Sequence, residues 1–208
     1  MTFDSPREGT VDSRDDLRLF VAIELAGEVR TALNDLQHEL QRQPGLNALR
    51  WVRPEGIHIT LKFLGERPAD HRMPIDVAVQ NAVAGIPPFD LRLGRLGTFG
   101  DNAPRVLWID VEGDLETLQR LQAQVERELR PLGFPTEKRP FSPHLTLARI
   151  QPERSRSVAA ALQRTVAEAT PPTAVIPVHQ IALMKSDLRP TGAVYTQLLT
   201  APLTEAIP

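Results

Sequence analysis

Hydrophobic and polar residues alternate along several short stretches of the chain, and such alternation is typical of strands with one buried face. Other stretches place apolar residues three and four positions apart, which is the period of an amphipathic helix. The alternating runs predict strands at 18–25, 57–64, 89–99, 105–113, 142–150, 175–187 and 194–203. The helical spacing predicts helices at 28–43, 69–84, 115–129 and 157–169.

The order of these elements favours an α+β fold with largely antiparallel sheets, because helices and hairpins are mixed without strict alternation. The turn-rich segments GDNAP (100–104) and LRPTGA (188–193) each predict a hairpin between the strands on either side. The order strand, helix, His-containing strand, helix occurs twice in loose form. We therefore expect two similar lobes.

The length of the chain, 208 residues, favours one domain or two closely joined lobes. Its first sixteen residues, MTFDSPREGTVDSRDD, are polar and lack the apolar segment of a secretory signal. We expect residues 1–16 to be a disordered leader and residues 17–208 to form a single two-lobed domain.

Composition then narrows the classes of function. Hydrophobic residues make up 41% and charged residues 24% of the chain, and the net charge is −2, as in ordinary soluble globular proteins. The longest apolar runs are far shorter than the roughly 18 residues that suggest a membrane span, so we expect a cytoplasmic protein. The absence of cysteine from the sequence excludes disulfides, thiolate nucleophiles and cysteine-based metal sites.

One short pattern occurs twice, as HITL at 58–61 and as HLTL at 144–147, with the two histidines 86 positions apart. Side chains two apart on a strand share a face, so His58 and Thr60 point to one side, and the same holds for His144 and Thr146. The apolar residues between them face a core. If both polar faces line one cleft, that site holds two imidazoles and two hydroxyls.

Two imidazoles can carry out acid–base chemistry, because the group titrates at about pH 6.5 and a neutral ring can accept a proton while a charged ring donates one. Threonine hydroxyls can donate hydrogen bonds to an anionic oxygen, and phosphate is the natural centre for such a site. The competing interpretation is an ordinary hydrogen-bonded pair in each strand, but the duplication favours a joint site. We expect surface or structural roles for His38, His71 and His179.

The motifs and their surroundings resemble the 2H phosphoesterase superfamily and, within it, the LigT-like RNA 2′,3′-cyclic phosphodiesterases. The supporting stretches are RLFVAIEL (18–25), RWVRPEGIHITLKFLGE (50–66), RVLWIDV (105–111) and RPFSPHLTLARI (139–150). With the last hairpin, the resemblance covers nearly all of residues 17–203. It implies two pseudo-symmetric lobes, each a mainly antiparallel sheet with outer helices, which form a central cleft with one His-x-Thr-x motif from each lobe.

The resemblance also implies an activity, the hydrolysis of an RNA or nucleoside 2′,3′-cyclic phosphate to a 2′-phosphate without a cofactor or a required metal. In that scheme His144 is the proton acceptor that activates water, and His58 is the proton donor to the departing 3′ oxygen. Thr60 and Thr146 hold the non-bridging phosphate oxygens. Arg149 matches a basic position that follows the second motif and contacts the phosphate.

Strand parity treats two basic residues in opposite ways. Arg149 should share the core-facing side with Leu145 and Leu147 in a regular strand, so that only a bulge or a strand end would turn it toward the phosphate. Lys62 falls on the face of His58 and is expected either to contact the phosphate or to be a solvated strand residue.

Three aromatic residues flank the motifs. Trp51, Phe63 and Phe141 are candidates for stacking on a base, as the recognition of single-stranded RNA often requires. Packing in the core or at its rim is the competing interpretation for them.

Other functions remain open at this point. RNA ligation that forms 2′–5′ linkages uses related chemistry in the same fold, and a non-catalytic nucleotide- or RNA-binding module would keep the cleft without turnover. A metal hydrolase is disfavoured because no acidic residue lies at a familiar ligand spacing beside the motifs. The expected partners are RNA ends or nucleoside 2′,3′-cyclic phosphates, and we expect a monomer because a closed two-lobed domain needs no second subunit.

Overall fold

The computed structural model describes residues 16–100, 102–190 and 192–205. The expected leader lies outside these residues apart from Asp16, which begins the first strand. The strands are β1 (Asp16–Glu24), β2 (Arg50–Trp51), β3 (His58–Pro68), β4 (Phe89–Phe99), β5 (Val106–Gly113), β6 (His144–Arg149), β7 (Val175–Val178), β8 (Gln180–Arg189) and β9 (Gly192–Pro202). The helices are α1 (Gly27–Gln41), α2 (Arg72–Asn81), α3 (Leu115–Leu129) and α4 (Ser155–Glu168), with short turns η2 (Pro54–Gly56), η3 (Ala69–His71) and η4 (Arg130–Leu132).

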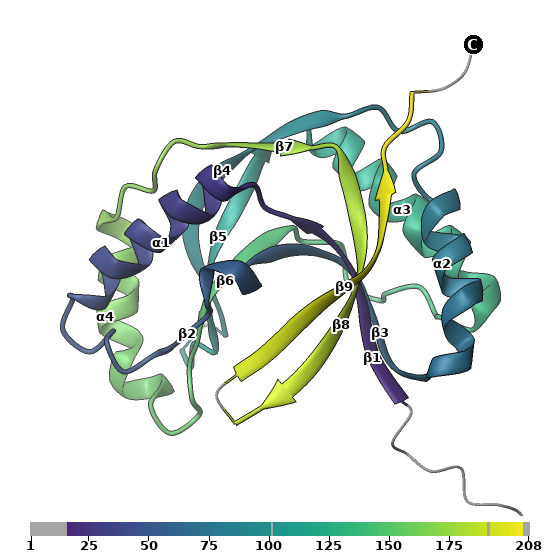
Figure 1. Cartoon of the computed structure of the whole chain (residues 1–208). Coiled ribbons are helices and arrows are strands. Elements are labelled where there is room, and N and C mark those ends of the chain that lie inside the picture. Colours follow the sequence, from purple (N-terminus) through teal and green to yellow (C-terminus); the bar gives the residue numbers. More distant parts are fainter. Residues whose placement is uncertain (1–15, 101, 191, 206–208) are drawn as a thin grey trace, which may run out of the picture.

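The strands form one curled sheet in the order β7-β4-β5-β6-β3-β1-β8-β9, with β2 also beside β6 (Figure 1). Neighbouring strands pair antiparallel throughout, which confirms the α+β class with antiparallel sheets. The central strands β3 and β6 meet at the single pair Ile59 and Leu145. The two lobes are therefore two half-sheets, β3-β1-β8-β9 and β6-β5-β4-β7, joined at this narrow contact.

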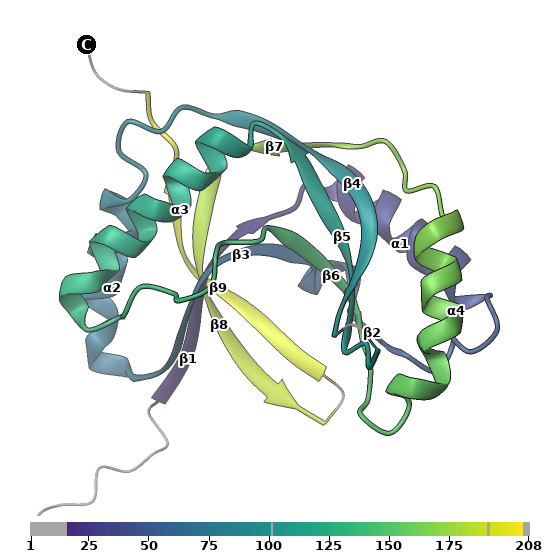
Figure 2. The same ribbon diagram turned by 180° about the vertical axis from the view of Figure 1, so that it is seen from behind.

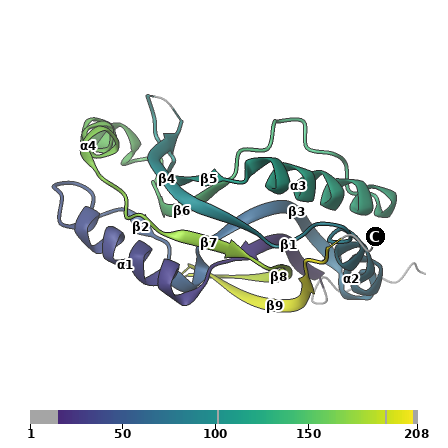
Figure 3. The same cartoon turned by 90° about the horizontal axis from the view of Figure 1, so that it is seen from above.

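Helices α1 and α3 each pack beside the half-sheet that does not contain the strand preceding them. The α1/α4 pair and the α2/α3 pair lie at opposite ends of the molecule (Figures 2 and 3). Helix α1 follows β1, yet the Gln37 amide donates to the backbone oxygens of Val52 and Leu147, at 2.8 and 2.9 Å, beside the other half-sheet. Helix α3 follows β5, yet it packs against β3. One cluster of buried side chains consequently runs through both half-sheets.

Helix α3 has the bounds that its sequence predicts. The Asp114 carboxylate caps its first turn by accepting a hydrogen bond from the Thr117 N–H at 3.0 Å. Gly133, with φ at 84°, follows the turn η4 in the left-handed region that favours glycine. The apolar stripe that the helix presents to the core is fully buried and consists of Leu118, Leu121, Val125 and Leu129.

The C-terminal strands differ from the expected single hairpin. Residues 175–187 form two strands that separate at His179, because β7 pairs with β4 in one half-sheet while β8 pairs with β1 and β9 in the other. Pro177 lies in β7, which is the end strand of the sheet, where the missing N–H of proline costs no ladder bond. The hairpin of β8 and β9 is confirmed.

No helix formed by the described residues is long and apolar enough to cross a membrane. The cytoplasmic location and the monomeric state that the sequence suggests stay predictions.

Candidate active site

The two His-x-Thr motifs lie on the adjacent central strands. His58 is the first residue of β3, and His144 is the first residue of β6. Their neighbours Ile59 and Leu145 pair with each other and are fully buried, so the polar side chains of both motifs point to the opposite face of the sheet. We call this side the motif face, and it carries His58, Thr60, His144 and Thr146. The fold thus brings together two motifs that are far apart in sequence.

Each imidazole is held by a backbone carbonyl two residues earlier in the chain. His58 Nδ1 lies 2.9 Å from the Gly56 oxygen, and His144 Nδ1 lies 2.8 Å from the Ser142 oxygen. A carbonyl can only accept, so Nδ1 is the protonated nitrogen of both rings, and Nε2 of the neutral ring carries the free lone pair. Nε2 is therefore the atom that can exchange a proton with a substrate.

Aromatic rings enclose the first histidine. The Phe20 ring stacks on His58 with centroids 4.7 Å apart, and the Tyr195 ring meets it edge-on at 5.1 Å. Gly56 allows this approach, because a Cβ atom there would lie 3.3 Å from the Tyr195 ring. Nothing in the sequence pattern singles out Phe20 or Tyr195 as neighbours of His58. The alternation of β1 places Phe20 on one face with Ala22, but only the fold brings that face to His58.

The second histidine has a similar environment. The Phe99 ring meets His144 edge-on at 4.8 Å, and the Trp108 ring lies 6.3 Å from it. Trp108 covers Gly97 on the paired strand, where any Cβ atom would overlap its ring. Both imidazoles are thus fixed by a carbonyl and by aromatic packing, which restricts the directions in which Nε2 can point.

Burial lowers the pKa of His58 from 6.5 to about 4. The hydrogen bond to the Gly56 oxygen opposes this shift, whereas the positive charge of Arg149 adds to it. At neutral pH the free protein therefore holds His58 as a neutral ring. An anion bound beside it would raise the pKa, because the negative charge stabilises the imidazolium.

Each motif is followed by a bulge that reverses the strand parity. Against β1, Lys62 pairs with Val21 and Thr60 pairs with Ala22, which leaves Leu61 as the extra residue. Leu147 is the equivalent extra residue of β6 against β5. One extra residue moves every later side chain to the other face.

The two bulges correct both parity predictions. Arg149 is exposed and shares the motif face with His144, instead of facing the core. Lys62 and Ala148 are buried on the core side, and Phe63 takes the exposed position that corresponds to Arg149.

Residues 28–190 match the family described as the 2′-5′ RNA ligase superfamily. The chain belongs to this superfamily. An RNA 2′,3′-cyclic phosphodiesterase of Geobacillus stearothermophilus is 36% identical over 170 residues, which are 73% of this chain and 53% of that relative, so the chain spans about half of its length. An RNA 2′,3′-cyclic phosphodiesterase of Thermus thermophilus is 35% identical over 191 residues and 88% of either chain. The crystal structure of E. coli LigT complexed with 3′-AMP matches with a TM-score of 0.71 and 26% identity, over 91% of this chain and 99% of LigT.

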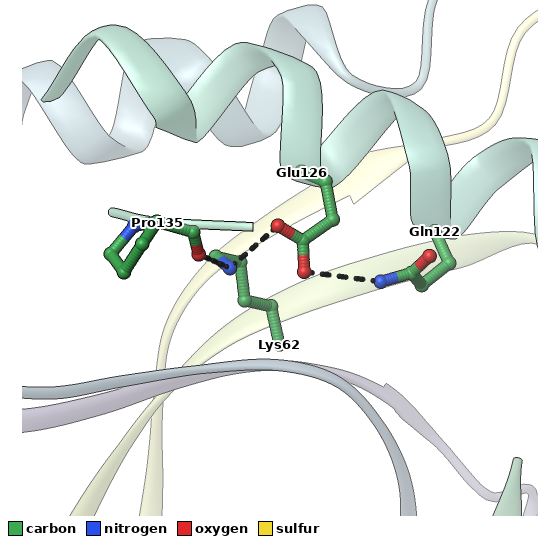
Figure 4. Close-up of polar contacts among 4 residues, drawn as sticks. All are labelled: Lys62, Gln122, Glu126 and Pro135. Atoms are coloured by element: carbon green, nitrogen blue, oxygen red, sulfur yellow. Dashed lines mark hydrogen bonds and ion pairs between the residues drawn. The ribbon is translucent and has the colours of Figure 1, made fainter. Parts of the chain in front are cut away.

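In this member of the 2′-5′ RNA ligase superfamily, Lys62 is not on the motif face. Its side chain is 2% exposed, and Nζ lies 2.7 Å from Glu126 Oε2 and 2.8 Å from the Pro135 oxygen (Figure 4). The Gln122 amide donates to the other Glu126 oxygen at 3.2 Å. The ammonium group thus joins β3 to α3 and to the segment after it, which corrects the expected contact between Lys62 and phosphate.

The three aromatic candidates for base stacking differ in their exposure. Trp51 and Phe141 pack against the hydrophobic core, and the Trp51 indole N–H donates to the Leu46 oxygen at 3.0 Å. Phe63 is 63% exposed and lies 6.2 Å from Phe20, on the motif face. Phe63 is thus the one of the three whose side chain is exposed on the motif face, whereas Trp51 and Phe141 follow the competing interpretation of packing at the core.

The remaining candidates lie elsewhere. His38, His71 and His179 are exposed on α1, in η3 and between β7 and β8. Within the described residues, no three or more His, Asp or Glu side chains are arranged to hold a metal ion.

Proposed function

We propose that this chain is an RNA 2′,3′-cyclic phosphodiesterase that forms 2′-phosphate ends. The observation that carries the proposal is the pairing of Ile59 with Leu145, which sets two carbonyl-anchored imidazoles on one face of adjacent strands. The relatives named RNA 2′,3′-cyclic phosphodiesterase, at 36% and 35% identity, support the same activity.

In the proposed step, a water oxygen attacks phosphorus while the bond from phosphorus to the 3′ oxygen breaks. His144 Nε2 takes the water proton, and His58 Nε2 gives a proton to the departing 3′ oxygen. The products are a 2′-phosphomonoester and a free 3′ hydroxyl, and a second proton exchange with solvent restores both rings. Because His58 is neutral in the free protein, it must gain its proton when the anionic phosphate binds.

Three further side chains are assigned to the phosphate. Thr60 and Thr146 follow the histidines on the motif face, where their hydroxyls can donate to non-bridging oxygens. The bulge at Leu147 turns Arg149 to the same face, and its guanidinium can stabilise charge that develops on the phosphate.

The proposal has a direct test. Incubation with a nucleoside 2′,3′-cyclic phosphate in the presence of EDTA is expected to yield the 2′-phosphate, identified by phosphorus NMR against both monophosphate standards. Exclusive formation of the 3′-phosphate would contradict the assigned leaving oxygen. Binding of the 2′-phosphate without turnover of any cyclic phosphate would instead favour a nucleotide-binding module.

RNA ligation is the second candidate, because the matched superfamily is named for it. If an RNA 5′ hydroxyl takes the place of the water, the same proton transfers produce a 2′–5′ phosphodiester and a free 3′ hydroxyl. Hydrolysis is preferred here because water is present at far higher concentration than any 5′ hydroxyl. A ligation assay with a 5′-hydroxyl acceptor RNA measures the ratio of the two products.

The depressed pKa of His58 predicts an unusual pH profile. A proton donor whose pKa lies below that of an ordinary imidazole sets the lower of the two pKa values in the bell-shaped profile, and only a minor fraction of the protein is then correctly protonated at neutral pH. The acid limb of kcat/KM, which reports the free enzyme, is therefore expected to bend near pH 4 instead of near 6.5. The acid limb of kcat should bend at a higher pH, because bound phosphate raises the pKa of His58. Steady-state kinetics between pH 3.5 and 9 measure both limbs, with circular dichroism at each pH to verify folding. An acid limb of kcat/KM centred on 6.5 would contradict the neutral state of His58.

A further inference from the structure

Two arginines lie side by side at the end of the motif face. Arg50 in β2 pairs with Arg149 in β6, and residues directly opposite each other in an antiparallel pair project to the same face. Their neighbours Trp51 and Ala148 pair in the same way and pack in the core. Arg50 therefore points to the motif face together with Arg149, and both side chains are exposed.

This arrangement is unfavourable unless an anion is present. Like charges directly opposite on neighbouring strands repel each other. In the part of the chain that the structure describes, neither guanidinium lies within ion-pair distance of a carboxylate. Bound phosphate would relieve the repulsion, and guanidinium groups match its oxygens in a bidentate geometry.

The Arg50 side chain extends to the tip of the β8–β9 hairpin. Gly192 begins β9 at the tip of the β8–β9 hairpin, and a Cβ atom on it would lie 3.9 Å from Arg50 Nη2. The hairpin belongs to the other half-sheet, and its tip extends toward β2 (Figures 1 and 2). The guanidinium of Arg50 thus lies where the hairpin of one half-sheet approaches β2, the short strand that pairs with the Arg149 end of β6.

We propose that Arg50 binds the phosphodiester that precedes the cyclic phosphate in an RNA chain, so that the site favours RNA 3′ ends over mononucleotides. This inference rests on the proposed function, in which Arg149 contacts the cyclic phosphate itself. A nucleoside cyclic phosphate has no preceding phosphodiester, whereas every RNA end has one. Arg50 is therefore a specificity-determining residue, and its contribution is absent with the smaller substrate.

The test compares two substrates that end in the same nucleoside 2′,3′-cyclic phosphate, one a mononucleotide and one an oligoribonucleotide. The Arg50→Gln variant should lower kcat/KM for the oligoribonucleotide about ten- to hundredfold, as expected for one lost hydrogen bond to a charged group. Its kcat/KM for the mononucleotide should stay within about twofold of the wild type, which also shows that the variant is folded. The matched control is Arg164→Gln, which removes an exposed arginine from α4 and should affect neither substrate.

A modified substrate isolates the contact. If the preceding phosphodiester is replaced by a neutral methylphosphonate, the wild type should lose the same factor as Arg50→Gln, and the variant should lose nothing more. The slope of log kcat/KM for the oligoribonucleotide against log salt concentration should also become shallower by about 0.7 in the variant, the value for one phosphate of a single strand.

The role of Arg50 and the proposed function fail in different measurements. Equal losses on both substrates would overturn the inference, because Arg50 would then act on the cyclic phosphate or through Arg149. Unchanged kinetics on both substrates would overturn it as well. A wild-type protein that turns over neither substrate would instead contradict the proposed function.

Discussion

Alanine in place of His58 or His144 is expected to lower kcat on a nucleoside 2′,3′-cyclic phosphate by about 10²- to 10⁴-fold. Each ring is held through Nδ1 and by aromatic packing, so each Nε2 is available for one proton transfer. Because the two transfers belong to one reaction step, the double variant should be little slower than the slower single variant. Steady-state kinetics with purified variants measure these effects.

Two controls distinguish a lost proton transfer from a general effect of the substitution. His179→Ala removes an exposed histidine outside the motifs and should leave kcat unchanged. Thermal unfolding of each variant, followed by circular dichroism, shows whether activity is lost with the fold intact. If folded His58→Ala or His144→Ala keeps more than about a tenth of the activity, that ring does not carry out a required proton transfer.

A substrate with sulfur in place of the 3′ oxygen distinguishes donor from acceptor. A thiolate leaves without a proton far more readily than an alkoxide, because thiol pKa values are about 8.5. The His58→Ala variant should therefore recover much of its rate on this substrate, and His144→Ala should not. Recovery of His144→Ala alone would reverse the two assigned roles.

The local pattern of the sequence was sufficient to predict most helices and strands, and the place of the motifs within their strands. Helix α3 could be predicted closely because its stripe, its Asp114 cap and its terminal Pro131-Gly133 segment all indicate the same bounds. The division of residues 175–187 into two strands could not be predicted. Strands β7 and β8 form one alternating run, and only their partner strands distinguish them.

In the candidate site, too, local alternation places only the residues whose strand is regular up to that point. His58, Thr60, His144 and Thr146 could be placed by parity because they precede the bulges. Lys62 and Arg149 could not, because a bulge depends on the register with a neighbouring strand and leaves no mark in the alternation of its own strand. The rings around the histidines, such as Tyr195 beside His58, depend on contacts between segments that are distant in sequence.

The buried ion pair of Lys62 and Glu126 is expected to dominate the response of stability to mutation. Glu126→Gln keeps the size of the side chain but leaves the Lys62 ammonium buried without a counter-charge. Breaking one partner of such a pair costs about 3–5 kcal/mol, so the free energy of unfolding should fall by that amount. Urea denaturation followed by tryptophan fluorescence and circular dichroism measures the change.

The same helix offers a matched control. Glu128 pairs with Arg127 at 3.0 Å, but the Arg127 side chain is 65% exposed, so Glu128→Gln should cost less than about 1 kcal/mol. The combined variant Lys62→Met, Glu126→Leu should recover part of the stability lost in Glu126→Gln, because it removes both charges from the interior. Equal costs for Glu126→Gln and Glu128→Gln would contradict the burial of the pair.

Kinetics with the same variants decide which role Lys62 has. If Lys62 contacted the substrate phosphate, its replacement by methionine would raise KM even in the fully folded protein. The ammonium here lies on the core side of β3, opposite the motif face, and is bound by Glu126 and Pro135. Because the bulge at Leu61 separates Lys62 from the face of His58, the combined variant should keep its KM for a cyclic phosphate while its unfolding midpoint shifts.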